Sequence, residues 1–210
     1  MSVANLSVTP TRILILSDTL QYLDGQPVGF CDRKTSISTV GGYAHTLRGP
    51  VIVAEFIRQA LDDVPTLHEA IGAVAGMMTA VEPELVAASV GIEATLGGWC
   101  SAEQRLKAVR VRRMQGMKQP EITVLPVGVH MLPTGKGLDD LLPGEADEAL
   151  MVRLALAQWK VMHHFSLPMC IGGLMHLTEV TATGARQWKA GEYPDYATMR
   201  AQLHPQAAAA

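Results

Sequence analysis

Residues 2–18 read SVANLSVTPTRILILSD, and this stretch decides how the rest of the chain is interpreted. Residues 12–16 are dominated by isoleucine and leucine and follow the turn signal Thr9-Pro10, a pattern that predicts a strand. Residues 2–7 are predicted to be its hairpin partner. Asp18 then lies at the end of the strand, close to the point where Ser2 begins the neighbouring strand.

The first fifty positions contain three equally spaced residues that could together hydrolyse an amide. Ser2, Asp18 and Lys34 follow one another at intervals of sixteen residues. Once Met1 is removed, an N-terminal serine supplies a nucleophilic hydroxyl and, in its free α-amine, the base that accepts the proton. An ammonium group at Lys34 would favour the alkoxide-like form of that hydroxyl, and a buried lysine needs a carboxylate such as Asp18 to stay charged.

This segment resembles the start of proteasome β subunits and of the HslV-type peptidase, which belong to the N-terminal-nucleophile (Ntn) hydrolase superfamily. Those chains begin with a catalytic threonine and have an aspartate and a lysine at the spacings of Asp18 and Lys34. The resemblance implies an α+β fold, a four-layer αββα sandwich. It also implies that a backbone N–H at Arg48 or Gly49 forms the oxyanion hole, and that Thr134 is a candidate supporting residue.

The function implied by the resemblance is hydrolysis of peptides, and the residues themselves allow a small amide equally well. Members of the family assemble into closed rings, so the resemblance implies a homo-oligomer. An unfoldase partner is left open, and no cofactor is predicted.

The sequence departs from the family pattern in ways that favour a second hypothesis. The nucleophile is a serine, and Leu20 stands where the family has an arginine two residues after the aspartate. Before Gly172-Gly173 the family has an aspartate and a serine, but residues 168–171 read PMCI. The alternative is therefore a catalytically inactive protein of the same fold that acts as a structural or assembly subunit.

The rest of the pattern predicts one domain over residues 1–190 and a tail over residues 191–210. Helices are predicted to begin at Gly49-Pro50 and at the capping box Thr66-x-x-Glu69, and a third is predicted over residues 145–162. Strands are predicted over the following ranges: 28–31, 37–47, 87–97, 106–112, 122–131, 170–181 and 185–189.

Composition and charge argue against several classes of function. The net charge is 17 − 20 = −3, which provides no basic surface for nucleic acid. A local run of basic side chains is interpreted as a solvated strand face: Lys107, Arg110, Arg112 and Arg113. The chain has no signal peptide and no apolar stretch near the roughly 20 residues that cross a bilayer, which predicts a cytoplasmic protein without membrane contact.

The three cysteines support a third hypothesis. Cys31, Cys100 and Cys170 are widely spaced and odd in number, which is typical of a reducing compartment. A thiol or small-molecule enzyme could use one of them, although none stands in a known cysteine–histidine signature. His163-His164 and His176 together with Cys170 match no standard zinc spacing, so no metal site is predicted.

Overall fold

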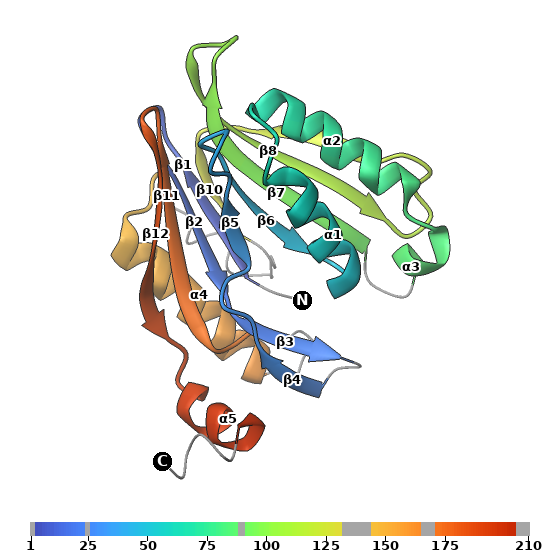
Figure 1. The fold of residues 1–210 in the computed structure, drawn as a ribbon. Helices are drawn as coiled ribbons and strands as arrows, with labels where there is room; N and C mark the ends of the chain where they lie inside the picture. Colours follow the sequence, from blue (N-terminus) through green and yellow to red (C-terminus); the bar gives the residue numbers. More distant parts are fainter. Residues whose placement is uncertain (1–2, 24–25, 88–90, 132–143, 165–170, 205–210) are drawn as a thin grey trace.

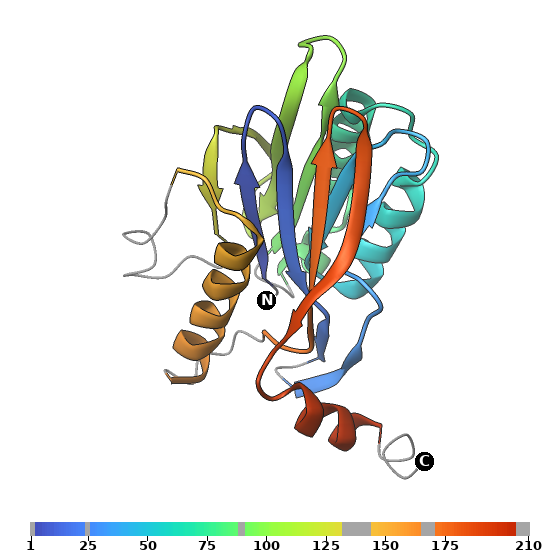
Figure 2. The same cartoon turned by 90° about the vertical axis from the view of Figure 1, so that its left-hand side faces the viewer.

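Two five-stranded antiparallel sheets face each other in the computed structural model, which describes residues 3–23, 26–87, 91–131, 144–164 and 171–204 (Figures 1 and 2). The first sheet has the order β10-β1-β2-β11-β12, and its strands are β1 (Ala4–Val8), β2 (Ile13–Asp18), β10 (Gly128–His130), β11 (Leu174–Thr181) and β12 (Gly184–Glu192). The second has the order β5-β6-β7-β8-β9, and its strands are β5 (Thr35–Ile37), β6 (Ala44–Arg48), β7 (Gly91–Cys100), β8 (Arg105–Met114) and β9 (Glu121–Leu125). A separate hairpin consists of β3 (Leu20–Leu23) and β4 (Gln26–Phe30).

Strand β2 lies in the middle of the first sheet because both of its faces are apolar. Ile13 and Ile15 point into the core between the two sheets, whereas Leu14 and Leu16 belong to the core on the other side. Successive side chains alternate across a strand, so an unbroken apolar run is buried on both faces. The N-terminal hairpin forms as predicted, with Ala4 opposite Ser17 and Val8 opposite Ile13.

Helices cover the two sheets unequally. The helices are α1 (Val51–Leu61), α2 (Leu67–Ala80), α3 (Pro83–Ala87), α4 (Glu148–His164) and α5 (Tyr196–Leu203). The first three lie over the second sheet, with α1 against β6 and α2 against β7 and β8. Over the first sheet lies the single long helix α4, which packs on β1, β2 and β12. Helix α5 lies beside β4.

The prediction of a four-layer αββα sandwich is wrong for this chain. Strand makes up 41% and helix 31% of the residues that the structure describes, so antiparallel sheet dominates. Among the described residues the first sheet carries one helix instead of a packed helical layer. The one helix described there, α4, can cover only part of a five-stranded sheet.

Two predicted strands are each divided in the structure. Residues 37–47 form the end of β5, a turn at Gly41-Gly42 and then β6, so the tandem glycines mark a hairpin turn. Residues 122–131 form β9 in the second sheet and β10 in the first, with Pro126 between them. Since proline has no N–H to donate, the sheet ladder is interrupted there and the chain crosses from one sheet to the other.

The basic strand face predicted at β8 is mostly paired. Lys107 pairs with Glu103, and Arg112 pairs with Glu121 at 2.7 Å. Arg113 is buried and donates to the carbonyls of Met78 and Val81 at 2.6 Å each, where helix α2 ends. This arginine therefore satisfies carbonyl groups that have no partner within the helix. None of the helices that the structure describes combines the length and the apolar character needed to cross a bilayer.

The capping box predicted at the start of α2 is confirmed. The Glu69 amide donates to the Thr66 hydroxyl oxygen at 3.2 Å, and that hydroxyl donates to the Glu69 carboxylate at 2.7 Å.

Replacing Thr66 with alanine removes both of these hydrogen bonds. We expect the free energy of unfolding to fall by about 1 kcal/mol, because an N-terminal amide of the helix loses its acceptor. Urea denaturation measures the loss. The Glu69→Gln variant keeps a side chain that can pair with Thr66 and should lose less; equal losses in the two variants would contradict this account.

Candidate active site

A buried ion pair lies where β2 ends and β5 begins. The Lys34 ammonium donates to Asp18 Oδ2 at 2.9 Å and to the Leu20 carbonyl at 2.5 Å. The Asp18 side chain is fully buried, and the Lys34 side chain is 10% exposed. Each of these buried charges stabilises the other, because burying either one alone would carry a large desolvation free energy.

Asp18 also holds the beginning of the chain. The Val3 amide donates to Asp18 Oδ1 at 3.0 Å, and the Gly172 amide lies 3.4 Å from Asp18 Oδ2. One carboxylate therefore joins the N-terminal strand, Lys34 and the segment that leads into β11. Charge-assisted hydrogen bonds of this kind fix geometry more strongly than neutral ones.

Thr19 and the glycine pair Gly172-Gly173 are site-forming residues that the sequence did not identify. The Thr19 and Leu20 amides donate to the Gly172 carbonyl at 3.3 and 3.2 Å, and the Leu174 amide donates to the Thr19 hydroxyl oxygen at 2.8 Å. Gly173 has a φ of +85°, and a Cβ there would lie 2.4 Å from the Thr19 hydroxyl oxygen. The tandem glycine was the available signal, because close backbone approach requires glycine.

Tyr193 is a second residue near the site that no sequence pattern singled out. It is buried, and its amide donates to the Gly173 carbonyl at 3.0 Å. Burial and, to a lesser degree, the charges of Asp18 and Asp195 raise its pKa well above the ordinary value for tyrosine. The hydroxyl therefore stays protonated in the folded protein.

Arg48 and Gly49, the predicted oxyanion donors, lie where β6 ends and α1 is about to begin. The pairing of Thr35 with Thr46 places this end of β6 at the same end of the sheet as Lys34. The Arg48 guanidinium is held by Glu93 at 3.2 Å, and Gly49 has a φ of +141° with a Cβ position 3.2 Å from the Gly91 carbonyl oxygen. A glycine is thus required at this strand-to-helix turn. The predicted nucleophile Ser2 and the supporting candidate Thr134 lie outside the described residues.

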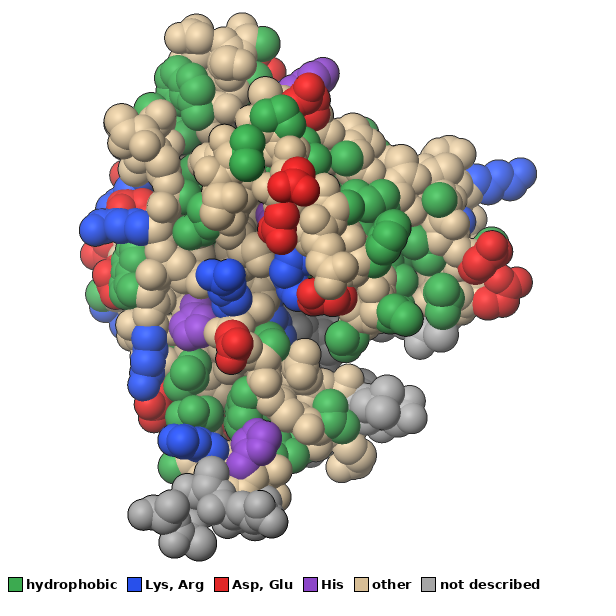
Figure 3. Space-filling view, viewed as in Figure 1, with side chains coloured by type: hydrophobic (Ala, Val, Ile, Leu, Met, Phe, Trp, Pro, Cys, Tyr) green, Lys and Arg blue, Asp and Glu red, His purple; other side chains and the backbone are tan. Residues whose placement is uncertain are grey.

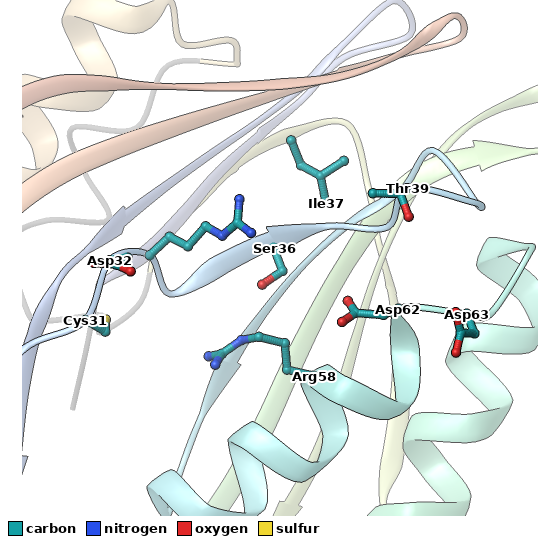
Figure 4. Close-up of a pocket in the computed structure, with 9 residues that line it drawn as sticks. Cys31, Asp32, Ser36, Ile37, Thr39, Arg58, Asp62 and Asp63 are labelled. Atoms are coloured by element: carbon teal, nitrogen blue, oxygen red, sulfur yellow. The ribbon is translucent and has the colours of Figure 1, made fainter.

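A pocket of about 410 Å³ opens beside the ion pair, between the β4–β5 connection and α1 (Figure 4). It is lined by Cys31, Asp32, Arg33, Ser36, Ile37, Thr39, Arg58, Asp62 and Asp63. Figure 3 shows acidic and basic side chains gathered in the middle of the same face. The Cys31 thiol donates to the Thr19 carbonyl at 3.3 Å, and burial raises its pKa, although the nearby Lys34 charge opposes this.

The other cysteine and histidine candidates are not gathered into a site. Cys100 is buried in β7, and Cys170 lies outside the described residues. His163 lies 3.6 Å from Asp195 and packs on the Trp159 ring, whereas His176 belongs to β11. Within the described ranges, no group of three or more histidine, cysteine, aspartate or glutamate side chains is placed to hold a metal ion.

His45 lies next to this pocket, opposite Ser36 in the β5–β6 register, and is fully buried. Burial and the positive charge of Arg58 lower its pKa from 6.5 to about 4. The imidazole is therefore neutral in the folded protein at neutral pH.

This depressed pKa gives a stability prediction with a definite sign. As the pH falls from about 6.5 to about 4, the unfolded chain binds a proton at His45 that the folded protein does not, so folding is destabilised by up to about 3 kcal/mol. Above pH 6.5 the effect is absent. Urea denaturation across this range should show a smaller pH dependence for His45→Gln, and equal slopes for variant and wild type would contradict the assignment.

The two facing antiparallel sheets give this chain a proteasome-like fold, and the solved structures that it resembles include Anbu proteins, described as ancestral β-subunits. Anbu from Yersinia bercovieri is 13% identical with a TM-score of 0.62, over 100% of this chain and 96% of that one. An Anbu Gly-1 mutant from Hyphomicrobium sp. strain MC1 is 12% identical with a TM-score of 0.62, over 100% and 94%.

These comparisons correct the family resemblance drawn from the first fifty residues. No protein-family model matches the sequence. No curated protein matches it. The similar solved structures include Anbu proteins at an identity of 12–13%, which shows the fold alone, so the assignment to proteasome β subunits or HslV-type peptidases that the spacing suggested is corrected to a shared fold. The spacing of Ser2, Asp18 and Lys34 was too short a pattern to distinguish among proteins of this fold.

Proposed function

We propose that this chain is an amide hydrolase whose nucleophile is Ser2, exposed as the N-terminal residue by removal of Met1. The observation that carries the proposal is the double role of Asp18, which accepts hydrogen bonds from both the Lys34 ammonium and the Val3 amide. The ion pair is thus hydrogen-bonded to the N-terminal strand at Val3, the first residue that the structure describes.

Each residue has a separate chemical role in the proposed reaction. The Ser2 hydroxyl attacks the amide carbonyl carbon, and the α-amine of the same residue takes its proton and passes it to the departing amine. Lys34 stabilises the negative charge that develops on the hydroxyl oxygen, and Asp18 holds Lys34 in position. A backbone N–H at Arg48 or Gly49 donates to the carbonyl oxygen as it becomes an oxyanion. Water then hydrolyses the acyl-serine ester.

Peptides or small amides are the proposed substrates, and a homo-oligomer is the proposed assembly. The outer face of α1 supports association, because Val51, Ile52 and Phe56 are 59%, 74% and 62% exposed. Exposed apolar side chains gathered on one helix are typical of a contact surface. A thiol enzyme is less well supported, because Cys31 donates its proton to a carbonyl and its pKa is raised.

Intact mass spectrometry of the purified protein, followed by an assay on fluorogenic peptide amides, tests the proposal. The expected mass is that of residues 2–210, and hydrolysis is expected only in preparations lacking Met1. A native protein that keeps Met1 would rule out the mechanism, since the free amine would belong to the wrong residue.

A catalytically inactive structural subunit is the second candidate. Residues 168–171, PMCI, favour it because they offer no carboxylate or hydroxyl to assist the α-amine. Protein that lacks Met1, is correctly folded and still hydrolyses none of a broad set of peptide amides would support this alternative. Light scattering would then establish the assembly in which it serves.

A further inference from the structure

Buried polar atoms without partners surround the pocket beside α1. The Ser36 hydroxyl oxygen and the Arg58 Nε are both buried, and neither has a hydrogen-bond partner among the described residues. Ser36 points from β5 toward Arg58 on α1, and both line the pocket (Figure 4). Polar groups are costly to bury unpaired, so two of them on one wall indicate that something else satisfies them.

His45, on the strand that pairs with β5, is a third unsatisfied group. Both of its ring nitrogens lack partners in the part of the chain that the structure describes. It stands opposite Ser36 in the strand register, and the charge of Arg58 acts on it. The Arg58 guanidinium can only donate, whereas the Ser36 hydroxyl can donate or accept, so a partner that the two share is an acceptor.

The charges around the pocket restrict what this acceptor can be. Arg33 and Arg58 favour a negative charge, whereas Asp32 lies at one end of the pocket and Asp62 and Asp63 at the other (Figure 4). One terminal nitrogen of Arg58 is already paired with Glu55, which leaves Nε for a ligand. Three acidic side chains repel a multiply charged anion such as phosphate, but a single carboxylate can reach the arginines between them.

We propose that this pocket binds a carboxylate group, which accepts hydrogen bonds from Arg58 Nε and the Ser36 hydroxyl. The carboxylate comes either from a free small acid or from an acidic side chain of the amide that occupies the adjacent Lys34–Asp18 site. The second source rests on the proposed function. The pocket adjoins that site, because its lining residue Cys31 donates to the carbonyl of Thr19, which follows Asp18, and its lining residue Arg33 precedes Lys34.

Calorimetric titration of the Ser2→Ala protein, which cannot turn over an amide, measures binding separately from catalysis. The probes are N-acetyl-glutamate methylamide, its neutral isostere N-acetyl-glutamine methylamide, and butyrate. The glutamate compound should bind at least about tenfold more tightly than the glutamine compound. Comparable binding of butyrate identifies a free acid as the source, and much weaker binding of butyrate identifies a side chain.

Three variants locate the binding. Arg58→Met should weaken the glutamate compound about tenfold or more, and Ser36→Ala should weaken it several-fold. Because the Ser36 hydroxyl has no partner in the described structure, its removal should leave the melting temperature unchanged or raised. Arg112→Met, which removes an arginine paired with Glu121 on β8, is the control and should bind normally.

The inference is overturned if the glutamate and glutamine compounds bind equally, if neither binds, or if Arg58→Met binds as the control does. Preferential binding of N-acetyl-lysine methylamide would also overturn it, because the acidic rim would then be the recognition element. Loss of carboxylate binding does not contradict the proposed hydrolase activity. Carboxylate binding without any hydrolysis by the wild-type protein contradicts the hydrolase activity and not the carboxylate site.

Discussion

Replacement of Ser2 by alanine is expected to lower kcat/KM for peptide amides by about 10³-fold or more. The variant keeps the α-amine but has no hydroxyl to form the acyl intermediate. Its stability should be nearly unchanged, because the hydrogen bonds that organise the site begin at Val3, Asp18 and Lys34. Steady-state kinetics and a thermal melt of the same preparation measure both quantities.

Two matched variants make the Ser2 result specific. Ser2→Thr keeps a hydroxyl at the same position and should retain a substantial part of the activity. Ser101→Ala alters an exposed turn residue and should change neither rate nor stability. Full activity in Ser2→Ala would refute the mechanism, and loss of that activity in Cys31→Ala would assign it to the thiol.

Replacement of Lys34 by methionine should lower the free energy of unfolding by about 3–5 kcal/mol. The methionine fills similar space but leaves Asp18 buried without its ammonium partner and the Leu20 carbonyl without its donor. The activity should fall as well, since the charge beside the nucleophile is lost. Urea denaturation of a variant whose fold is verified by circular dichroism provides the stability value.

A double-mutant cycle separates the ion pair from general packing. Asp18→Asn combined with Lys34→Met should cost less than the sum of the two single changes, because no unpaired charge remains buried. Lys107→Met, which breaks the exposed pair with Glu103, should cost much less than Lys34→Met, because solvent screens surface ion pairs. If Lys34→Met costs as little as Lys107→Met, the Asp18–Lys34 pair does not organise the site.

Local patterns predicted the elements whose signals lie close together in the sequence. The hairpin of β1 and β2, the capping box of α2 and the C-terminal pairing of β11 with β12 all formed. In each case a turn residue, a cap or an alternating apolar run identifies the element without reference to distant residues. The contact between Asp18 and Lys34 was likewise anticipated from strand ends and spacing.

The predictions that failed concern features that depend mainly on contacts between distant parts of the chain. Residues 122–131 were predicted to form one strand, yet the chain is interrupted at Pro126 and β9 and β10 belong to different sheets. The sequence of a strand does not indicate which other strand it pairs with. Arg113 looked like a surface residue because its partners are carbonyls of α2, more than thirty positions away. Helix α5 has no buried residues, so its sequence lacks the apolar stripe that would predict a helix.

The bond between Gly172 and Asp18 has a consequence for the timing of synthesis. These two residues are 154 positions apart, and the Gly172-Gly173 segment joins Asp18, Thr19 and Leu20 only when β11 pairs with β2. A ribosome must therefore deliver almost the whole polypeptide before the surroundings of the carboxylate are complete. An N-terminal fragment that ends before Gly172 would lack this part of the surroundings of Asp18, whatever chemistry the site performs.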